Sequence, residues 1–211
     1  MKSNTVRVVL FATAVSLLAL QADRARAQGE FLNRGESGVG LEVSGQFSLD
    51  PGYYTPDGVL AGALGYSFWG CVDPGVEVQN AVGKYANNQT VFAYGVTVHP
   101  LKFVLQLPVQ PFASFAHFSS SGVGGTSEGL GVYGRIPAAK NVFIVPRASV
   151  AWSDLSNSEA VYAADITSAV RLATRTLLTV GMGYERTDFG DGFISFGIGL
   201  VELEPPHKRH R

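Results

Sequence analysis

Few residues in this chain have the side-chain chemistry that catalysis or metal binding requires. Two histidines lie in its body, His99 and His117, and Ser114 precedes the second of them by three positions. If this stretch is a strand, Ser114 and His117 face opposite sides, because side chains alternate along a strand. His99 precedes a proline in an expected turn, and neither histidine has an obvious carboxylate partner. Cys71, the single cysteine, makes no metal site with the two tail histidines, so we expect no enzyme activity, metal or cofactor.

A set of charged residues shares a second pattern, since each lies on the polar face of an alternating segment. These residues are Glu42, Glu77, Arg135, Arg147, Asp165, Arg171 and Glu185. Their charges come close to balance, and enclosed charges must pair because leaving one alone is costly. Arginine suits such pairs, since its planar group makes two hydrogen bonds to a carboxylate. The pattern predicts an enclosed charge network that fills a space rather than opening it. The alternative is a set of surface charges on a soluble protein.

The elements that carry these charges are segments in which apolar and polar residues alternate. Val161–Ala173 is rich in alanine and could be a helix by propensity, yet its two charges share one face when every second residue is read. Similar segments flank it at hairpin spacing, so we predict a strand. Ten such segments are expected: residues 39–49, 59–69, 76–85, 90–98, 109–118, 130–136, 142–152, 161–173, 176–185 and 193–200. They predict an all-β, antiparallel, up-and-down transmembrane β-barrel of about ten strands, with eight as the alternative.

The face opposite the apolar one indicates which side of the barrel meets lipid. It is dominated by Gly, Ala, Ser and Thr, whereas a solvated face of a soluble sheet carries many more Lys and Glu residues. We therefore expect the apolar face to point outward to lipid and the polar face to line the lumen. Aromatic residues near the strand ends fit interfacial girdles. These residues are Tyr53, Tyr54, Phe68, Trp69, Tyr85, Trp152, Phe189 and Phe193.

The two ends of the chain differ from the alternating middle. Residues 1–27 combine a basic start, an uncharged apolar run and the small-residue site "ARA", which predicts a secretory signal peptide. We expect residues 28–38 to form a periplasmic N-terminal segment, residues 39–201 the barrel, and residues 202–211 a polar tail with the basic cluster "HKRHR". The net charge is −1 for the whole chain and near −4 without the leader, so nucleic-acid binding is not expected.

The lengths of the connections predict that both ends of the chain lie in the periplasm. Polar and mostly long connections begin near Asp50, Ser119, Ser153 and Arg186, and short ones lie near Cys71, Pro137 and Thr174. Long outer loops and short inner turns are typical of outer-membrane barrels. In this scheme Asp73–Gly75 ("DPG") is a turn, residues 119–129 are a long loop, and residues 99–107 turn before the next strand.

The chain resembles the small outer-membrane β-barrel proteins of Gram-negative bacteria, the OmpA/OmpX-like group. The likeness rests on the predicted leader, on "GVGLEVSGQF", "GALGYSFW" and "TVGMGYE", and on the closing "GFISFGIGL". It implies an outer-membrane location, contact with lipid and lipopolysaccharide, insertion by the barrel-assembly machinery, and a monomer. Two departures stand out. Many members have eight strands, and many end on an aromatic residue, whereas "ELEPPHKRHR" follows Val201 here.

These observations predict an outer-membrane barrel with a packed polar lumen and at most weak pore activity. Its role would be structural or would lie in surface recognition by the outer loops. One alternative is a soluble periplasmic β-barrel that binds a small apolar ligand. Another is a lipid-modifying outer-membrane enzyme with its site at the rim. The strand number, which sets the width of the lumen, decides between an open pore and a plugged one.

Overall fold

The computed structural model describes residues 28–49, 57–82, 90–105, 107–120, 123–154, 160–188 and 192–205. Two short 3-10 helices occur, η1 (Gln28–Phe31) and η2 (Pro100–Phe103). The strands are β1 (Gly38–Ser48), β2 (Gly58–Ser67), β3 (Val72–Val82), β4 (Thr90–Val98), β5 (Val109–Ser120), β6 (Val123–Gly134), β7 (Ile136–Ala139), β8 (Val142–Ser153), β9 (Ala160–Arg171), β10 (Thr176–Thr187) and β11 (Gly192–Leu203). None of the described helices is long and apolar enough to cross a membrane.

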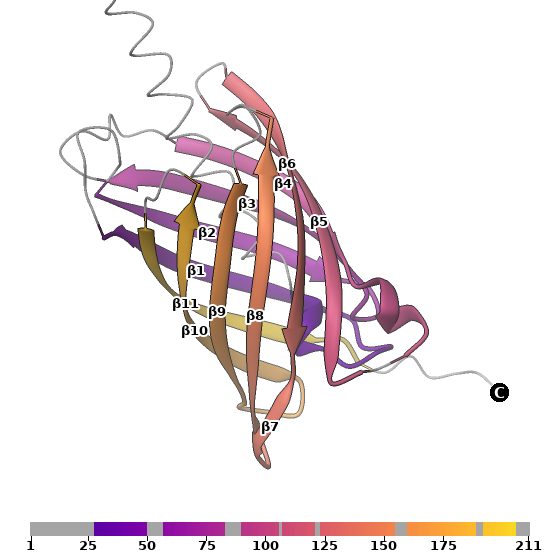
Figure 1. The fold of residues 1–211 in the computed structure, drawn as a ribbon. Coiled ribbons are helices and arrows are strands. Elements are labelled where there is room, and N and C mark those ends of the chain that lie inside the picture. Colours follow the sequence, from indigo (N-terminus) through magenta and orange to yellow (C-terminus); the bar gives the residue numbers. More distant parts are fainter. Residues whose placement is uncertain are drawn as a thin grey trace, which may run out of the picture.

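The strands close into a ring in which each one pairs with its neighbours in the sequence (Figure 1). The first and last strands pair along their full lengths, from Gly38 opposite Leu203 to Ser48 opposite Phe193. β7 continues β6 after a break at Arg135, and both pair with β8, so the two segments together count as one strand of the barrel. The prediction of an all-β up-and-down barrel of about ten strands is confirmed.

The barrel has two ends that differ in their connections. The start of β1 and the described C-terminal residue 205 lie at one end, together with the turn at residues 69–71, η2 and the turn at residues 172–175. We call this the N/C end. The connections after β1, β3, β5, β8 and β10 lie at the other end, which we call the loop end. The predicted leader and the "HKRHR" tail fall outside the described residues.

The alanine-rich segment that begins at Val161 is a strand, as its alternation predicts. β9 pairs with β8 on one side and with β10 on the other, from Val142 opposite Val170 to Val161 opposite Thr187. A helix here would leave both neighbours with an unpaired edge. The alternating environment therefore outweighs the helix propensity of the alanines.

Two expected connections are wrong because strands continue through them. Asp73–Gly75 belongs to β3, and Pro74 is tolerated there because it pairs only with Val96 of β4, beyond the end of the β2 pairing. Residues 119–129 are not a long loop, since β5 extends to Ser120 and β6 begins at Val123. Glycine and small polar residues read as loop signals in water, but they also suit the inner wall of a narrow barrel.

The outer surface of the barrel is apolar. Leu41, Ile166 and Ile198 are 55%, 46% and 55% exposed, although large aliphatic side chains are normally buried in soluble proteins. Residues on the opposite face of the same sheet are enclosed, and Glu77 and Gln79 are 2% and 0% exposed. The inverted polarity predicted from the alternation is therefore present in the structure.

The interior is not uniformly polar, which differs from the expected polar lumen. A cluster of buried apolar side chains fills it near the N/C end: Phe31, Leu32, Phe112, Tyr133, Phe143, Val145, Ala169, Leu177, Val201 and Leu203. β5 has the register that places Phe112 and Phe118 inside and Phe115 outside. The sequence left this register open because three phenylalanines compete over seven positions.

Candidate functional site

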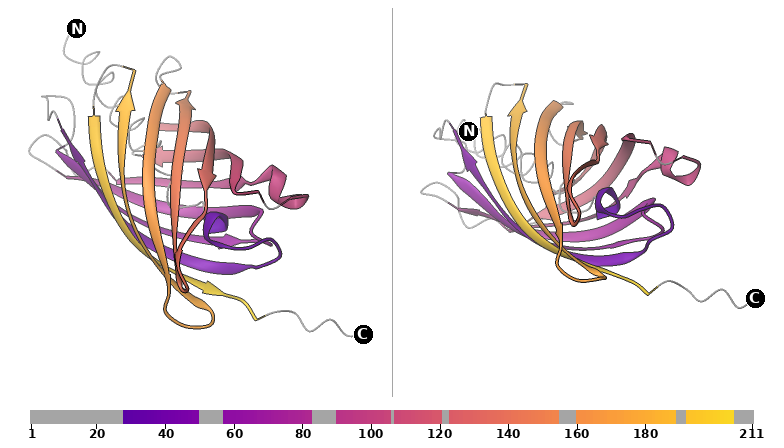
Figure 2. Two further views of the ribbon diagram at one scale, coloured as in Figure 1. Left: turned by 60° about the horizontal axis from the view of Figure 1, so that its bottom comes forward. Right: turned by 90° about the horizontal axis from the view of Figure 1, so that it is seen from below.

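The interior of the barrel holds the residues that precede β1. We call residues 28–37 the N-terminal segment. Its first turn, η1, is buried at all four positions and lies inside the curve of the sheet (Figure 2). The sequence separated this stretch from the barrel because its polar residues show no strand alternation. The structure places Gln28 and Phe31 in the lumen, so the segment and the barrel form one unit.

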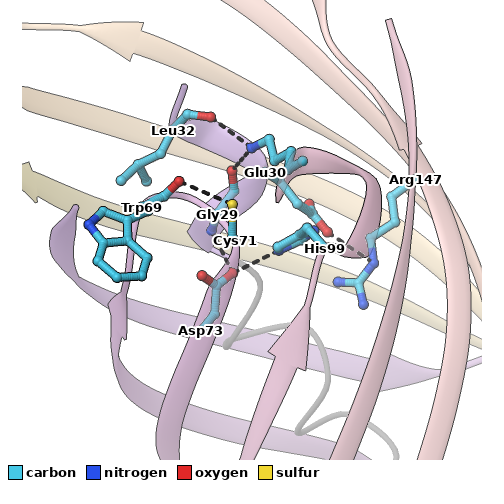
Figure 3. Close-up of polar contacts among 9 residues, drawn as sticks. Gly29, Glu30, Leu32, Trp69, Cys71, Asp73, His99 and Arg147 are labelled. Carbon is cyan, nitrogen blue, oxygen red and sulfur yellow. Dashed lines mark hydrogen bonds and ion pairs between the residues drawn. The ribbon is translucent and has the colours of Figure 1, made fainter. Parts of the chain in front are cut away.

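A buried histidine–aspartate pair holds the start of the segment. His99 Nε2 lies 2.9 Å from Asp73 Oδ2, and both side chains are fully buried (Figure 3). The backbone N–H of Gly29 donates to the same oxygen at 2.7 Å. Burial lowers the pKa of His99, and the hydrogen bond to Asp73 opposes this shift. His99 therefore donates its Nε2 proton as a neutral imidazole, and Asp73 receives two donors.

Lys102 of η2 caps the first turn of the segment from the N/C end. Its ammonium donates to the carbonyl oxygens of Gly29 and Leu32, the second at 2.8 Å (Figure 3). The carbonyl of Gly29 also accepts the N–H of Leu32 within the turn, whereas the carbonyl of Leu32 follows the turn, where a cation favours the local dipole. Burial lowers the pKa of Lys102 to about 8, while the charge of Asp73 raises it.

Glu30 reaches across the lumen to the opposite wall. Its Oε1 lies 3.4 Å from Arg147 Nε of β8, and both side chains are almost completely buried. The guanidinium of Arg147 also stacks 4.3 Å above the ring of Phe112. Burial raises the pKa of Glu30 to about 8, against the attraction of Arg147, which lowers it. Both side chains are thus removed from water, and loss of either one would leave the other buried without its partner.

The rest of the segment crosses a strained turn between β2 and β3. Trp69 and Gly70 have φ angles of 55° and 67°, and the N–H of Cys71 donates to the carbonyl of Phe68 at 2.9 Å. Two positive φ angles in succession define a type I′ hairpin turn, in which tryptophan is unfavourable. A Cβ at Gly70 would lie 2.7 Å from the carbonyl oxygen of Asn33 in the segment. Position 70 therefore requires glycine, because the backbone of the N-terminal segment lies against it.

The structure places the predicted charge network in separate groups. Glu42, Arg147, Asp165 and Glu185 line one cavity on the loop-end side of Phe31. Glu77 accepts a hydrogen bond from Gln79 at 2.6 Å on a different part of the wall. The direct partner of Arg147 described above is Glu30, which the sequence analysis did not include. The alternation placed these side chains on the inner face but could not predict which of them meet.

Two predicted arginines lie near the N/C end rather than in that cavity. Arg135 donates to Asn33 Oδ1 at 2.8 Å and stacks 4.0 Å above the ring of Phe143. Arg171 donates to the carbonyl of Thr174 at 2.8 Å and closes the β9–β10 turn. Arg135 therefore contacts the N-terminal segment, and Arg171 stabilises a turn.

The contacts of the segment escaped the sequence analysis because they are non-local. His99 was expected to lack a carboxylate partner, and this was wrong because Asp73 lies beside it although 26 positions separate them. Asp73 belongs to the sequence "DPG", which is typical of a turn, so its place in a strand was not predicted. Lys102 and Glu30 lay in stretches without alternation. Only a register that places Asp73 in β3 could have pointed to this pair.

The remaining chemical candidates are placed as follows. Ser114 faces inward, whereas His117 lies on the outer face, 5.3 Å from the ring of Tyr94, so the predicted opposite orientation is confirmed. Cys71 is buried in its turn, where burial raises its thiol pKa. Within the described parts of the chain, no group of three His, Cys, Asp or Glu residues is placed to hold a metal ion.

The residues predicted to form the aromatic girdle differ in their exposure. Phe68 and Trp69 are exposed at the N/C end, and Trp152 is exposed near the loop end. Phe193 is wrong as a girdle residue, because it is only 3% exposed and pairs with inward-facing Glu185. Tyr53, Tyr54, Tyr85 and Phe189 lie outside the described residues.

These features define a closed ten-stranded antiparallel β-barrel with an apolar outer surface and a lumen occupied by its own N-terminal segment. No family model and no curated protein matches the chain. Among solved structures, it is similar to the translocator domain of the autotransporter NalP from Neisseria meningitidis. The TM-score is 0.56 at 9% identity, covering 90% of this chain and 97% of that domain.

Two further similarities to solved structures are weaker. An outer membrane channel from Pseudomonas putida F1 has a TM-score of 0.49 at 10% identity, with 82% of this chain and 97% of the channel covered. The attachment invasion locus protein Ail of Yersinia pestis has a TM-score of 0.37 at 12% identity, with 81% and 99% covered. At such identity, the similarity to NalP shows the barrel fold.

Proposed function

We propose that this chain is an outer-membrane β-barrel whose lumen is closed by its own N-terminal segment. Its role in the cell envelope is structural or lies in surface recognition by the connections at the loop end. The observation that carries this proposal is the combination of an apolar outer wall with Gly29, Glu30 and Leu32 held inside. A lipid environment explains the wall, and the occupied lumen argues against a wide pore.

The closed ring also supports the proposed surroundings. Because β1 pairs with β11, the first and last described strands close the sheet on itself, which favours a monomer in lipid. We place the N/C end in the periplasm, since short turns, the start of β1 and residue 205 lie there. Insertion by the barrel-assembly machinery and contact with lipopolysaccharide follow from an outer-membrane location.

The two alternatives are less well supported. A soluble barrel with an apolar ligand would carry its apolar residues inside, whereas Leu41 and Ile198 lie outside in a belt larger than soluble monomers normally expose. A rim enzyme would need an accessible base. The His99–Asp73 pair is fully buried and is engaged with Gly29, so we propose that it has a structural role.

Membrane fractionation and gel mobility test the location. We expect the protein to remain with outer membranes through washes with high salt and high pH, and to migrate faster in unheated than in heated gel samples. Release by either wash would exclude the membrane barrel. A heat shift is expected because a closed barrel remains compact in detergent until the ring opens.

Deletion of residues 28–36 tests the closed lumen. The predicted leader is kept for export, or the barrel is refolded without it. In planar bilayers we expect the full protein to conduct weakly and the deletion variant to conduct several-fold more, because η1 no longer fills the lumen. A control variant with Glu202→Gln, an exposed change at the N/C end, should conduct like the full protein. Equal conductance of the full protein and the deletion variant would contradict the plug.

A further inference from the structure

The β7–β8 hairpin projects from the N/C end of the barrel (Figure 1). β6 pairs with β5 as far as Gly134, whereas β7 pairs with β8 alone among the described strands. At the base of the hairpin, the backbone N–H of Arg171 donates to the carbonyl of Asn141 at 2.8 Å. A cavity lies between the hairpin and this end of β9, and its volume accessible to water is about 230 Å³. A single ordered water needs roughly 10–15 Å³ on this measure, so a small anion fits.

Basic side chains dominate the wall of this cavity. Among the described residues that line it, three are basic and none is acidic: Arg135, Pro137, Ala139, Lys140, Asn141, Val142, Phe143 and Arg171. The charge of Arg171 acts unfavourably on Arg135, so the two guanidinium groups lie near each other. In the described part of the chain, no carboxylate forms an ion pair with Arg135, Lys140 or Arg171. An anion between them would relieve this repulsion.

Both arginines retain hydrogen-bond donors for a ligand. Arg135 donates from Nη1 to Asn33 Oδ1 at 2.8 Å, and Arg171 donates from Nη1 to the carbonyl of Thr174 at 2.8 Å. A guanidinium carries more N–H donors than these bonds use, so those on Nε and Nη2 remain available within the described structure. The ring of Phe143, 4.0 Å from the guanidinium of Arg135, restricts the orientation of that group. Paired N–H donors on a planar group match the oxygens of an oxyanion.

The charge balance around the cavity indicates the class of anion. Glu36 lies outside the cavity wall, and its negative charge acts favourably on Arg135. Its carboxylate oxygens, however, accept the backbone N–H of Asn33 at 2.7 Å and the side-chain amide of Asn33 at 3.0 Å. Glu36 therefore offsets only part of the charge of the three basic side chains. The remaining excess is large enough for a doubly charged anion.

We propose that this cavity binds the phosphate group of a phosphomonoester that reaches the N/C end. Such a group carries about two negative charges at neutral pH, together with oxygens that accept strong hydrogen bonds. Arg135 and Arg171 donate to these oxygens from the inner side of the hairpin. Lys140, exposed at the tip of the hairpin, adds its charge from the water side. The same phosphate occurs in soluble esters and in the headgroup of phosphatidic acid.

Isothermal titration calorimetry of the purified full barrel in a maltoside detergent at pH 7 tests this proposal, with glycerol 3-phosphate as the probe. We expect saturable binding that is absent for glycerol. Dimethyl phosphate is a diester with a single negative charge, so it should bind several-fold more weakly. Absence of saturable binding of glycerol 3-phosphate, or equal binding of dimethyl phosphate, would overturn the proposal.

A second titration distinguishes the two sources of the phosphate. Dihexanoyl phosphatidic acid carries the same phosphate on two short acyl chains, and its uptake by protein-free micelles is subtracted. Binding several-fold tighter than that of glycerol 3-phosphate would support a lipid headgroup as the ligand. Equal or weaker binding would support a soluble ester.

Matched variants assign the binding to the cavity. Arg171→Gln should weaken the binding of glycerol 3-phosphate about ten-fold, because it removes a charge-assisted donor. Lys140→Gln changes an exposed turn residue and should weaken binding several-fold, whereas Lys140→Arg should retain it. Arg175→Gln is the control, since Arg175 is exposed at the same end but does not line the cavity. All four variants should keep the heat-dependent gel shift. Unchanged affinity in both Arg171→Gln and Lys140→Gln, or an equal loss in Arg175→Gln, would refute the assignment.

Discussion

At the scale of single residues, the docking of the N-terminal segment depends on close approach. A Cβ at Gly29 would lie 2.7 Å from Asp73 Oδ2 and 2.8 Å from His99 Nε2. The pair that receives the segment therefore leaves no room for a side chain at this position. Gly62 of β2 offers a comparison, because a Cβ there meets nothing within 4 Å.

Gly29→Ala should loosen the segment while leaving the barrel intact. The methyl group collides with the pair or forces it apart, so we expect bilayer conductance several-fold above that of the unchanged protein. Gly62→Ala is the control and should leave conductance unchanged. Both variants should keep the heat-dependent gel shift. Equal conductance in the two variants would show that Gly29 does not seat the segment.

The pH dependence of docking follows from two buried charges. The pKa of Glu30 is raised from 4.5 to about 8, so the docked state holds a proton that the undocked state loses, and docking weakens as pH rises from 4.5 to 8. The pKa of Lys102 is lowered from 10.5 to about 8, so docking strengthens again between pH 8 and 10.5. Conductance should therefore pass through a maximum near pH 8.

A bilayer titration from pH 5 to pH 10 measures this maximum. In Glu30→Gln, the side chain no longer titrates, so the rise in conductance on the acidic side should disappear. A flat profile in the unchanged protein would contradict the assignment. So would an acidic limb that persists in Glu30→Gln.

The residues of this site show where sequence analysis reaches its limit. Alternation placed Glu42, Arg147 and Glu185 on the inner wall, because a period of two needs only local information. It could not pair Glu30 with Arg147, because that contact joins a stretch without periodicity to a strand more than a hundred positions away. Such partners follow from the register of the closed ring.

At the scale of elements, each strand has one face on the outer wall of the barrel and one face on the inner wall. Ile166 lies near the middle of β9 and is 46% exposed on the outer wall. Its neighbour Thr167 turns inward and lines the cavity. The same strand thus meets two environments within one residue, and its alanines are compatible with both.

Ile166→Arg should destabilise the barrel by about 2–4 kcal/mol, because it places a charge in the middle of the hydrocarbon layer. Equilibrium unfolding in urea from lipid vesicles measures this change. Ile166→Leu retains the apolar volume and should cost less than ~1.5 kcal/mol. Equal costs for the two substitutions would mean that this face of β9 does not meet lipid.

The boundaries of the elements were less predictable than their number. Ten alternating segments were expected, and the described barrel has ten strands when β6 and β7 are counted as one. The errors fell at Asp73–Gly75 and at residues 119–129, where glycine, proline and serine usually end a strand. Inside a barrel the same residues continue one, since the inner wall needs small side chains and Pro74 needs no donor at its unpaired edge.

At the scale of the whole molecule, the lumen and its occupant are matched in size. An eight-stranded barrel is just filled by its own side chains, and ten strands enclose more space. Phe31 and Leu32 enter this extra space and pack against Phe112, Val145 and Leu177. The segment therefore belongs to the core of the protein, although it precedes the first strand.

Ring closure should be indispensable for folding. Truncation after Asp188 removes β11, which pairs with both β1 and β10, and exposes two rows of unpaired backbone groups to lipid. We expect this variant to show no heat-dependent gel shift and no insertion into vesicles. Truncation after Pro205 spares β11 and should fold normally. A heat shift in the shorter variant would contradict the closed ring.

The scattered anchors of the N-terminal segment also set the timing of assembly. Its partners Asp73, Lys102 and Arg147 come from β3, η2 and β8, so they become neighbours only after most strands of the barrel have paired. The N-terminal segment can therefore dock only after the later strands have formed. Docking then follows closure of the cylinder, and release of the segment should precede unfolding of the cylinder.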